Sequence, residues 1–536
     1  MSIAKVWNWL CVGVASGMMA GAGCAFAMQA AAQDEKTPQD VKKDTPTDGK
    51  AGDAAVIIQD RWYTMELMGG KAGYTNVKVS EKDGNITTSS RVKLAIGRGD
   101  SGVEVRIETQ FVETKDGKPV SMKKRESMGQ SPIETSYKFV EGGKIEVLTK
   151  QAGKTKKETV DAPTEEWMTP AAADRYARER MKAGEKEIAV SMMDPQMGVQ
   201  VVKSVRTGFT PEQIDLGGEK VDAIKTDVSV QLGTMPITST EYVDAEGELL
   251  QSITAMGGMQ IVMKKATRAQ ATASGGGDKM PEIMVSTFVK PDKAIKGART
   301  LEEGQYLLKV RSGELPDLPT TGSQTVTRID KTSAKVVVSA TKLNVASEKD
   351  ASDAAFLAAT TMADADDSNI KQFVAKSLKG MDKASNSEKA RKLRDAVHEH
   401  IAEKNLGVGM ATASEVVRTK EGDCSEHGVL LAAALRAAKI PSRVAVGLIY
   451  ADQFAGGHDI FGYHMWAQAL LPDADGKMAW TDLDATLRGG QVYDATHITL
   501  ATSALGDNDA MASLMTTAQV MGNLDITIEK TSTDAK

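Results

Sequence analysis

The strongest constraint on the fold is an alternation of apolar and polar side chains that runs through residues 56–267. In one such stretch Val103, Val105 and Ile107 fall on the same side, because successive side chains of a β-strand point to opposite faces. Glycine pairs such as the one at 142–143 interrupt the alternation and favour tight turns between neighbouring strands. This pattern predicts an antiparallel β-rich domain with charged, solvated outer faces.

The rest of the chain divides by local pattern. One helix is expected inside the β-rich domain, with Thr169 as its N-cap and Pro170 in its first turn. Residues 268–282 hold three successive glycines and predict a Gly-rich linker, and strand patterns then predict a small β-region at 283–345. Over 346–536, apolar residues first recur at intervals of three and four, which predicts helices, and then follow strand patterns.

The amino-terminal sequence predicts export. Residues 1–27 have an early cation at Lys5, an apolar run of small residues and a small-residue cleavage site at 25–27, the pattern of a secretory signal peptide. An uncleaved membrane anchor and lipid attachment at Cys24 are the alternatives. Residues 28–55 are charged, contain Pro and Gly, and predict a disordered tether. We therefore expect a periplasmic or extracellular protein, with or without an anchor in the cell envelope.

Composition and spacing argue against two classes of ligand. The net charge of −6 over 536 residues, with no basic module, argues against nucleic-acid binding. His398 and His400 are two apart on an expected helix, so they point to different faces and cannot hold one metal ion. No Cys or His pair has zinc-site spacing, and the acidic run at 362–369 lacks the glycine and closing glutamate of an EF-hand loop. We expect neither a metal nor a cofactor.

Residues with chemical reactivity gather in one region. All six histidines lie within 398–497, together with Cys424, the only cysteine outside the expected signal peptide. Cys424 precedes the strongly helical stretch "SEHGVLLAAALRAA", so we expect it at a helix N-terminus. There the N–H groups and the helix dipole favour the thiolate, which is the reactive form of cysteine. The alternative interpretation is a small apolar residue that begins a buried helix.

A candidate base and its orienting acid follow from a predicted hairpin. Two strand patterns joined by "PDADGK" predict a hairpin centred near residue 474, which brings His464 opposite Asp484 within one residue of register. A carboxylate beside an imidazole holds its tautomer and stabilises the imidazolium, as in a nucleophile–base–acid triad.

Two other residues compete for these roles. Asp482 shares a strand face with Asp484 but pairs farther down the ladder, nearer Trp466, so Asp484 is preferred. His427 lies one helical turn from Cys424 and is the rival base, but no carboxylate is evidently placed to orient it.

The motifs "GDCSEHGVLLAAALRAAKIPSRVAVGLIY", "YHMWAQAL" and "WTDLDAT" together resemble the transglutaminase-like superfamily of cysteine enzymes. The resemblance covers roughly residues 345–500. It implies a papain-like core in which the nucleophilic cysteine begins a helix and the histidine and aspartate come from adjacent antiparallel strands. Carried over residue by residue, Cys424, His464 and Asp484 take the three catalytic roles.

The resemblance makes residues 346–536 a transglutaminase-like catalytic domain, so the expected fold is α+β, with this core preceded by a mostly antiparallel β-domain. It implies an exported cysteine enzyme that acts on amide bonds of peptides or proteins through acyl-thioester chemistry, as a protease, deamidase or transglutaminase. The alternative is a catalytically silent envelope protein that binds peptides or proteins with the same fold. The expected partner is a peptide or protein substrate, and association with the cell envelope is compatible with the signal sequence.

Overall fold

The computed structural model describes residues 55–98, 101–127, 132–151, 154–232, 235–273, 281, 284–404, 411–488, 490–506, 513 and 516–532. The expected signal peptide and the expected tether up to residue 54 lie outside these residues. Within the described part of the chain, no helix is both long and apolar enough to cross a membrane.

The amino-terminal half forms one sheet of fourteen antiparallel strands, as the alternating pattern predicts. Across the sheet the order is β8-β7-β6-β5-β4-β3-β2-β1-β14-β13-β12-β11-β10-β9, so the first and last strands of the region pair in the middle. The strands are β1 (Val56–Leu67), β2 (Gly70–Lys82), β3 (Asn85–Arg98), β4 (Ser101–Thr114), β5 (Pro119–Ser127), β6 (Ile133–Val140), β7 (Lys144–Gln151), β8 (Lys154–Asp161), β9 (Glu187–Met193), β10 (Val201–Leu216), β11 (Glu219–Leu232), β12 (Met235–Val243), β13 (Leu249–Met256) and β14 (Met259–Ala266).

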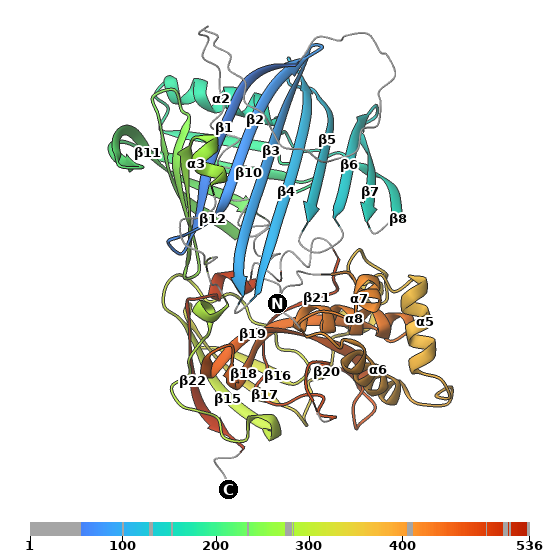
Figure 1. Ribbon diagram of the computed structural model, residues 1–536. Coiled ribbons are helices and arrows are strands. Elements are labelled where there is room, and N and C mark those ends of the chain that lie inside the picture. Colours follow the sequence, from blue (N-terminus) through green and yellow to red (C-terminus); the bar gives the residue numbers. More distant parts are fainter. Residues whose placement is uncertain are drawn as a thin grey trace.

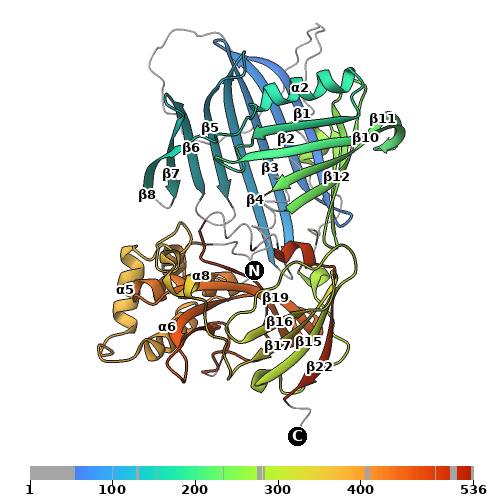
Figure 2. The same ribbon diagram turned by 180° about the vertical axis from the view of Figure 1, so that it is seen from behind.

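The inner face of this sheet carries the core of the β-domain. Leu94 of β3 and Val105 of β4 pair across the ladder, and both side chains are completely buried. Figure 2 shows β10 and β12 crossing in front of β2–β4, so the sheet curls and its own inner faces enclose the apolar side chains. The expected turn at 142–143 is present, with both glycines at the positive φ that tight turns require.

Two helices accompany the sheet. α2 (Pro170–Lys182) begins after Thr169, as the sequence predicts, and packs Ala173 and Ala177 on β9. α3 (Arg268–Thr272) is one short turn closed by a capping box and lies on β1 and β2, so the first residues of the expected Gly-rich linker are helical. Residues 274–280, which hold the three glycines, lie outside the described residues.

The carboxy-terminal half combines helices with two four-stranded sheets, of order β16-β17-β15-β22 and β20-β19-β18-β21. Its helical segments are η1 (Val285–Thr287), η2 (Ala298–Thr300), α4 (Glu348–Ser352), η3 (Ala354–Phe356), α5 (Ser368–Ser377), α6 (Asn386–His400), α7 (Ala413–Thr419) and α8 (Cys424–Ala437). Its strands are β15 (Glu303–Val310), β16 (Gln324–Arg328), β17 (Ser333–Ser339), β18 (Ser442–Phe454), β19 (Gly457–Pro472), β20 (Met478–Leu483), β21 (Ile498–Ser503) and β22 (Leu524–Thr531).

The small β-region is joined to the rest of this half. β22 comes from near the end of the chain and pairs with β15 along its length. The Gln324 side chain also donates to the carbonyl of Thr499 and accepts from its N–H, both at 2.8 Å, as a neighbouring strand would. The small sheet therefore supports β21 and, through it, the sheet that contains the hairpin expected at the site.

The two halves meet through a close backbone contact (Figure 1). Gly258, in the turn between β13 and β14, donates its N–H to the carbonyl of Met521 at 2.8 Å. A Cβ atom at Gly258 would lie 2.1 Å from the carbonyl oxygen of Gly522, so this contact requires glycine.

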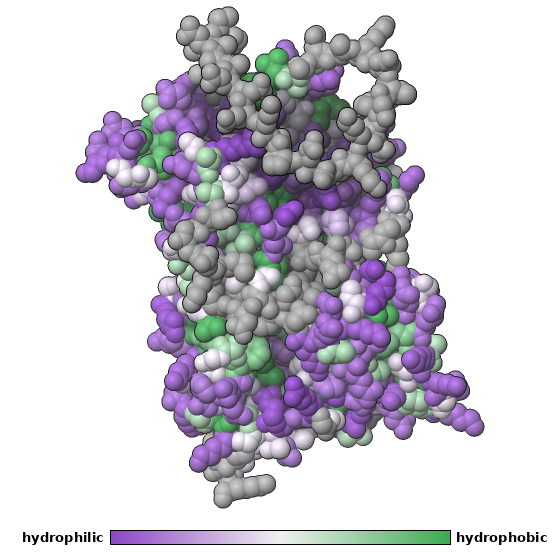
Figure 3. Space-filling model, viewed as in Figure 1, coloured by the Kyte–Doolittle hydropathy of each residue, from purple (hydrophilic) through white to green (hydrophobic). Residues whose placement is uncertain are grey.

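The face of the molecule in Figure 3 is mostly hydrophilic over its described residues, with smaller hydrophobic areas among the hydrophilic ones.

Candidate active site

Cys424 is the first residue of α8, as expected from the sequence. Asp423 is the N-cap residue, and its carboxylate accepts from the N–H of Ser425 at 2.9 Å. Glu426 completes a capping box by accepting from the N–H of Asp423, also at 2.9 Å. Because nearly all of α8 is buried, packing fixes the position of this N-terminus, while Cys424 itself is only half-buried.

Glu426 would place a second negative charge beside the thiol if it were ionised. Its side chain is completely buried, and burial together with the neighbouring Asp423 carboxylate raises the pKa of Glu426 well above its usual value. This shift favours the neutral form of Glu426 and so reduces the negative charge beside the thiol.

His464 lies on β19 and Asp484 follows the end of β20, and their side chains are in contact. His464 Nε2 lies 2.8 Å from Asp484 Oδ2, and both residues are buried. This contact leaves Nδ1 of the ring for Cys424, with which His464 also forms a side-chain hydrogen bond. Burial lowers the pKa of His464, but the Asp484 carboxylate and Cys424 outweigh it and raise that pKa to about 9. The imidazolium is thus the stable form of this histidine at neutral pH.

The register of the hairpin differs by two residues from the sequence-based expectation, which exceeds the expected margin of one residue. Ala467 pairs with Leu483 and Pro472 with Met478, so the hairpin centre lies one residue beyond 474. The side chains of His464 and Asp484 nevertheless meet, through the contact between Nε2 and Oδ2.

Opposing effects act on the Cys424 thiol. Burial raises the pKa of this thiol, and so does the negative charge of Asp423. The hydrogen bond to His464 and the positive charge of its ring lower that pKa. Among these described side chains His464 favours the thiolate, and the N-terminus of α8 acts in the same direction.

The rival residues have structural partners. Both oxygens of Asp482 are occupied: Oδ1 accepts from Trp466 Nε1 and Gln468 Nε2, each at 2.7 Å, and Oδ2 accepts from Ser323 Oγ at 2.5 Å. These contacts tie β19 to the small β-region, and they agree with the expectation that Asp482 lies nearer Trp466.

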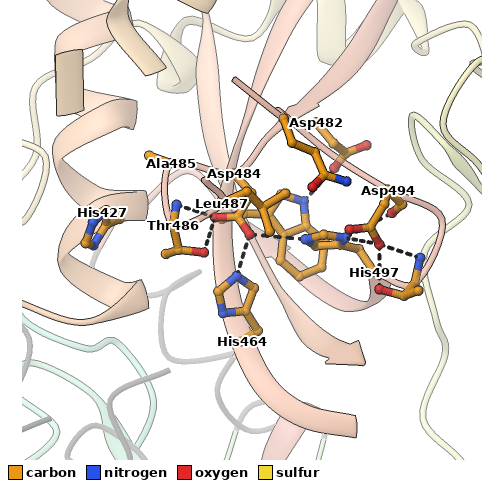
Figure 4. A network of polar contacts seen from close by, with 12 residues as sticks. His427, His464, Asp482, Asp484, Ala485, Thr486, Leu487, Asp494 and His497 are labelled. Atoms are coloured by element: carbon orange, nitrogen blue, oxygen red, sulfur yellow. Dashed lines mark hydrogen bonds and ion pairs between the residues drawn. The ribbon is translucent and has the colours of Figure 1, made fainter. Parts of the chain in front are cut away.

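His427 is a packing residue in this structure. Its Nδ1 donates to the carbonyl of Asp423 at 2.6 Å, and burial lowers the pKa of His427 to about 4. It therefore stays neutral, and it lies apart from the network around Asp484 in Figure 4.

Further residues hold Asp484 in place. Thr486 donates to Asp484 Oδ1 from both its N–H and its hydroxyl, each at 2.7 Å. Arg394 of α6 is buried and donates from Nε to the carbonyl of Asp484 at 2.8 Å. His497 approaches the other carboxylate oxygen, with Nε2 3.2 Å from Oδ2.

These supporting residues were not found from the sequence. The short spacing between Asp484 and Thr486 is a signal that could have been used, because Asp often accepts from the backbone two residues on. Arg394 and His497 carry no comparable local signal. Both reach Asp484 from distant segments of the chain. Figure 4 shows His497 on the side of Asp484 opposite Thr486.

Possible metal ligands converge at one place among the described residues. One nitrogen each of His464 and His497 and an oxygen of Asp484 lie within 4.8 Å of one another. Both histidines already contact the same carboxylate oxygen, and Thr486 occupies the other one. We therefore interpret this group as a hydrogen-bond network rather than as a metal centre.

Comparison with known proteins agrees with the sequence motifs. Residues 372–485 match the model of the Transglutaminase-like superfamily. No curated protein matches the chain significantly.

Three solved structures show limited similarity. A β-barrel-like protein of the DUF1849 domain from Brucella abortus is 12% identical, with 40% of this chain and 98% of that chain covered and a TM-score of 0.30. A "Putative Cysteine Protease" from Cytophaga hutchinsonii is 16% identical, with 44% and 86% covered and a TM-score of 0.25. A "putative protease" from Parabacteroides distasonis is 11% identical, with 68% and 69% covered and a TM-score of 0.17. The family match and the order of the motifs make residues 372–485 of this chain a transglutaminase-like domain.

Proposed function

We propose that this chain is an exported cysteine enzyme that cleaves or exchanges amide bonds of peptides or proteins through an acyl-thioester. The observation that supports it most directly is the chain of side-chain hydrogen bonds from Cys424 through His464 to Asp484. Such a chain activates a thiol and orients its base. The amino-terminal sequence supports export.

The first half of the reaction forms the thioester. In the resting thiolate–imidazolium pair the thiol proton is already on His464 Nδ1, and the Cys424 sulfur attacks the carbonyl carbon of the substrate, so that a C–S bond forms. The carbonyl oxygen takes the negative charge, which N–H groups at the start of α8 would stabilise. His464 then gives its proton to the amide nitrogen, the C–N bond breaks, and an amine or ammonia leaves.

The second half releases the acyl group. Water or a second amine attacks the thioester carbonyl while His464 accepts the proton of the attacking group. The C–S bond breaks, and the resting thiolate–imidazolium pair is restored. Attack by water makes the enzyme a protease or a deamidase, whereas attack by an amine makes it a transglutaminase. Asp484 stays ionised throughout and stabilises the imidazolium.

The proposal is tested by the rate of Cys424 alkylation with iodoacetamide from about pH 4 to pH 10. We expect an apparent thiol pKa below the reference of about 8.5, and a return to at least that value in His464→Ala. His458→Ala is the matched control, because His458 is exposed on the same strand. An active thiol is then tested for ammonia release from glutamine-containing peptides and for incorporation of a fluorescent amine.

The opposite result is equally informative. If native Cys424 is inert, or if its titration ignores His464, the acyl-transfer mechanism is wrong. The alternative, a catalytically silent protein that binds peptides with the same fold, would then be preferred.

A further inference from the structure

His497 faces an oxygen atom at each of its two ring nitrogens. The residue precedes β21, and its side chain is completely buried. Nε2 lies 3.2 Å from Asp484 Oδ2, and Nδ1 lies 2.9 Å from the carbonyl oxygen of Asp494. Figure 4 shows the ring between these two aspartates.

These two contacts determine the protonation state of the ring. A backbone carbonyl can only accept a hydrogen bond, and so can an ionised carboxylate, so each ring nitrogen has to donate. A neutral histidine has only one N–H and would turn a lone pair toward an oxygen in a dry site, which is costly. The alternative of a protonated Asp484 is disfavoured, because its two oxygens already accept from His464 and from Thr486.

The charged groups around the ring support the same assignment. Asp494 Oδ1 lies 3.4 Å from Nδ1, and the Asp494 carboxylate is balanced on its other side by Arg299 at 2.9 Å. Burial lowers the pKa of His497, but Asp494 and Asp484 outweigh it and raise that pKa. The remaining titratable groups beside the ring are Tyr493, stacked at 4.5 Å, and His464, with ring centroids 5.9 Å apart.

We propose that His497 is a permanently charged positioning residue, an imidazolium that keeps Asp484 ionised and shares its Oδ2 with His464. Its catalytic consequence rests on the proposed function. Without the second imidazolium, the whole charge of Asp484 would act on His464 and bind its proton more tightly. Because a general acid works best when its pKa is near the working pH, such a His464 would release its proton too slowly to the leaving amine.

The charge of His497 is measured on the unaltered chain. In protein with ¹⁵N-labelled histidine, we expect both ring nitrogens of His497 to give protonated-type shifts from about pH 5 to pH 8. The signals are assigned from single substitutions of the six histidines. A signal of an unprotonated ring nitrogen for His497 at pH 7 would overturn the proposal.

Its effect on the site is measured in His497→Gln, which keeps an N–H donor but carries no charge. The loss of a positive charge about 6 Å away should raise the apparent pKa of His464 by roughly one to two units at an effective dielectric constant of about 20. The exposed His458→Gln should leave the titration of His464 unchanged.

An unchanged or lowered His464 pKa in folded His497→Gln would refute the tuning role. The two proposals fail in different ways. An inert Cys424 with the expected titrations of both histidines would refute the enzyme but leave the charge assignment intact. A reactive Cys424 beside a neutral His497 would refute only the present inference.

Discussion

Replacing Asp484 by Asn tests the electrostatic basis of the candidate site. The pKa of His464 is raised from 6.5 to about 9, with the Asp484 carboxylate as the largest cause that acts in this direction. Loss of a shift of this size corresponds to about 3 kcal/mol less stabilisation of the imidazolium, at 1.36 kcal/mol for each pKa unit. Part of the shift comes from the Cys424 contact and burial opposes it, so this figure gives the order of magnitude of the carboxylate's effect.

The assay is the pH dependence of Cys424 alkylation. In Asp484→Asn the imidazolium no longer supports the thiolate at neutral pH. The pKa of Cys424, lowered from 9.0 to about 7 in the native site, should rise again, so we expect the rate near pH 7 to fall by up to about fiftyfold. The expected residual profile is that of an ordinary thiol.

Asp482→Asn is the matched control for this prediction. Asp482 is a second buried carboxylate close in sequence, but it contacts Trp466, Gln468 and Ser323 instead of His464. We expect Asp482→Asn to lower the midpoint of urea unfolding and to leave the alkylation profile in place. If Asp484→Asn kept the native profile, or if both variants lost it equally, the reasoning from the His464–Asp484 contact would be refuted.

Three further predictions follow from the same structure. Thr486→Ala removes one hydroxyl donor from Asp484 and should lower the free energy of unfolding in urea by about 1 kcal/mol. We expect the alkylation rate of Cys424 to fall by less than about tenfold. An unchanged unfolding midpoint would contradict this prediction. Gly258→Ala brings a Cβ atom against the carbonyl of Gly522 and should lower the free energy of unfolding by roughly 1–3 kcal/mol. Thermal unfolding measures this, and an unchanged melting temperature would count against the contact. Burial raises the pKa of Asp484, but the contact with His464 outweighs it and lowers that pKa well below its usual value. The charge of Asp484 therefore contributes stability that is present above the unfolded pKa of about 4 and is lost as the pH falls below it. The stability of the wild type should therefore decline more steeply below about pH 4 than that of Asp484→Asn, and parallel curves would exclude this contribution.

Local sequence patterns were sufficient to predict the strands of the β-domain and the start of α8. The period of two predicts the antiparallel strands of the β-domain, because burial of one face requires alternation. Asp423, Cys424 and the apolar run after them predict the start of α8, because capping and packing are both local to that segment. The hairpin spacing brought His464 and Asp484 to within two residues of facing each other, because a short turn leaves little freedom of register.

Contacts between segments far apart in the sequence could not be predicted from local patterns. Arg394 reaches Asp484 from α6, and His497 reaches it from the segment before β21, although neither has a spacing that points to the site. The pairing of β22 with β15 and of β14 with β1 likewise joins segments about two hundred residues apart.

The sequence by itself therefore determined the candidate triad, the helix that carries its cysteine and the strand content of both halves. The tertiary structure alone decided the charge of the site. That charge depends on which acceptors face each nitrogen of His497 and on the burial that raises the pKa of Glu426. Both effects act through space in a buried region of low dielectric constant. There a displacement of a few ångströms changes the strength of an interaction by several-fold, and no pattern of neighbouring residues records that distance.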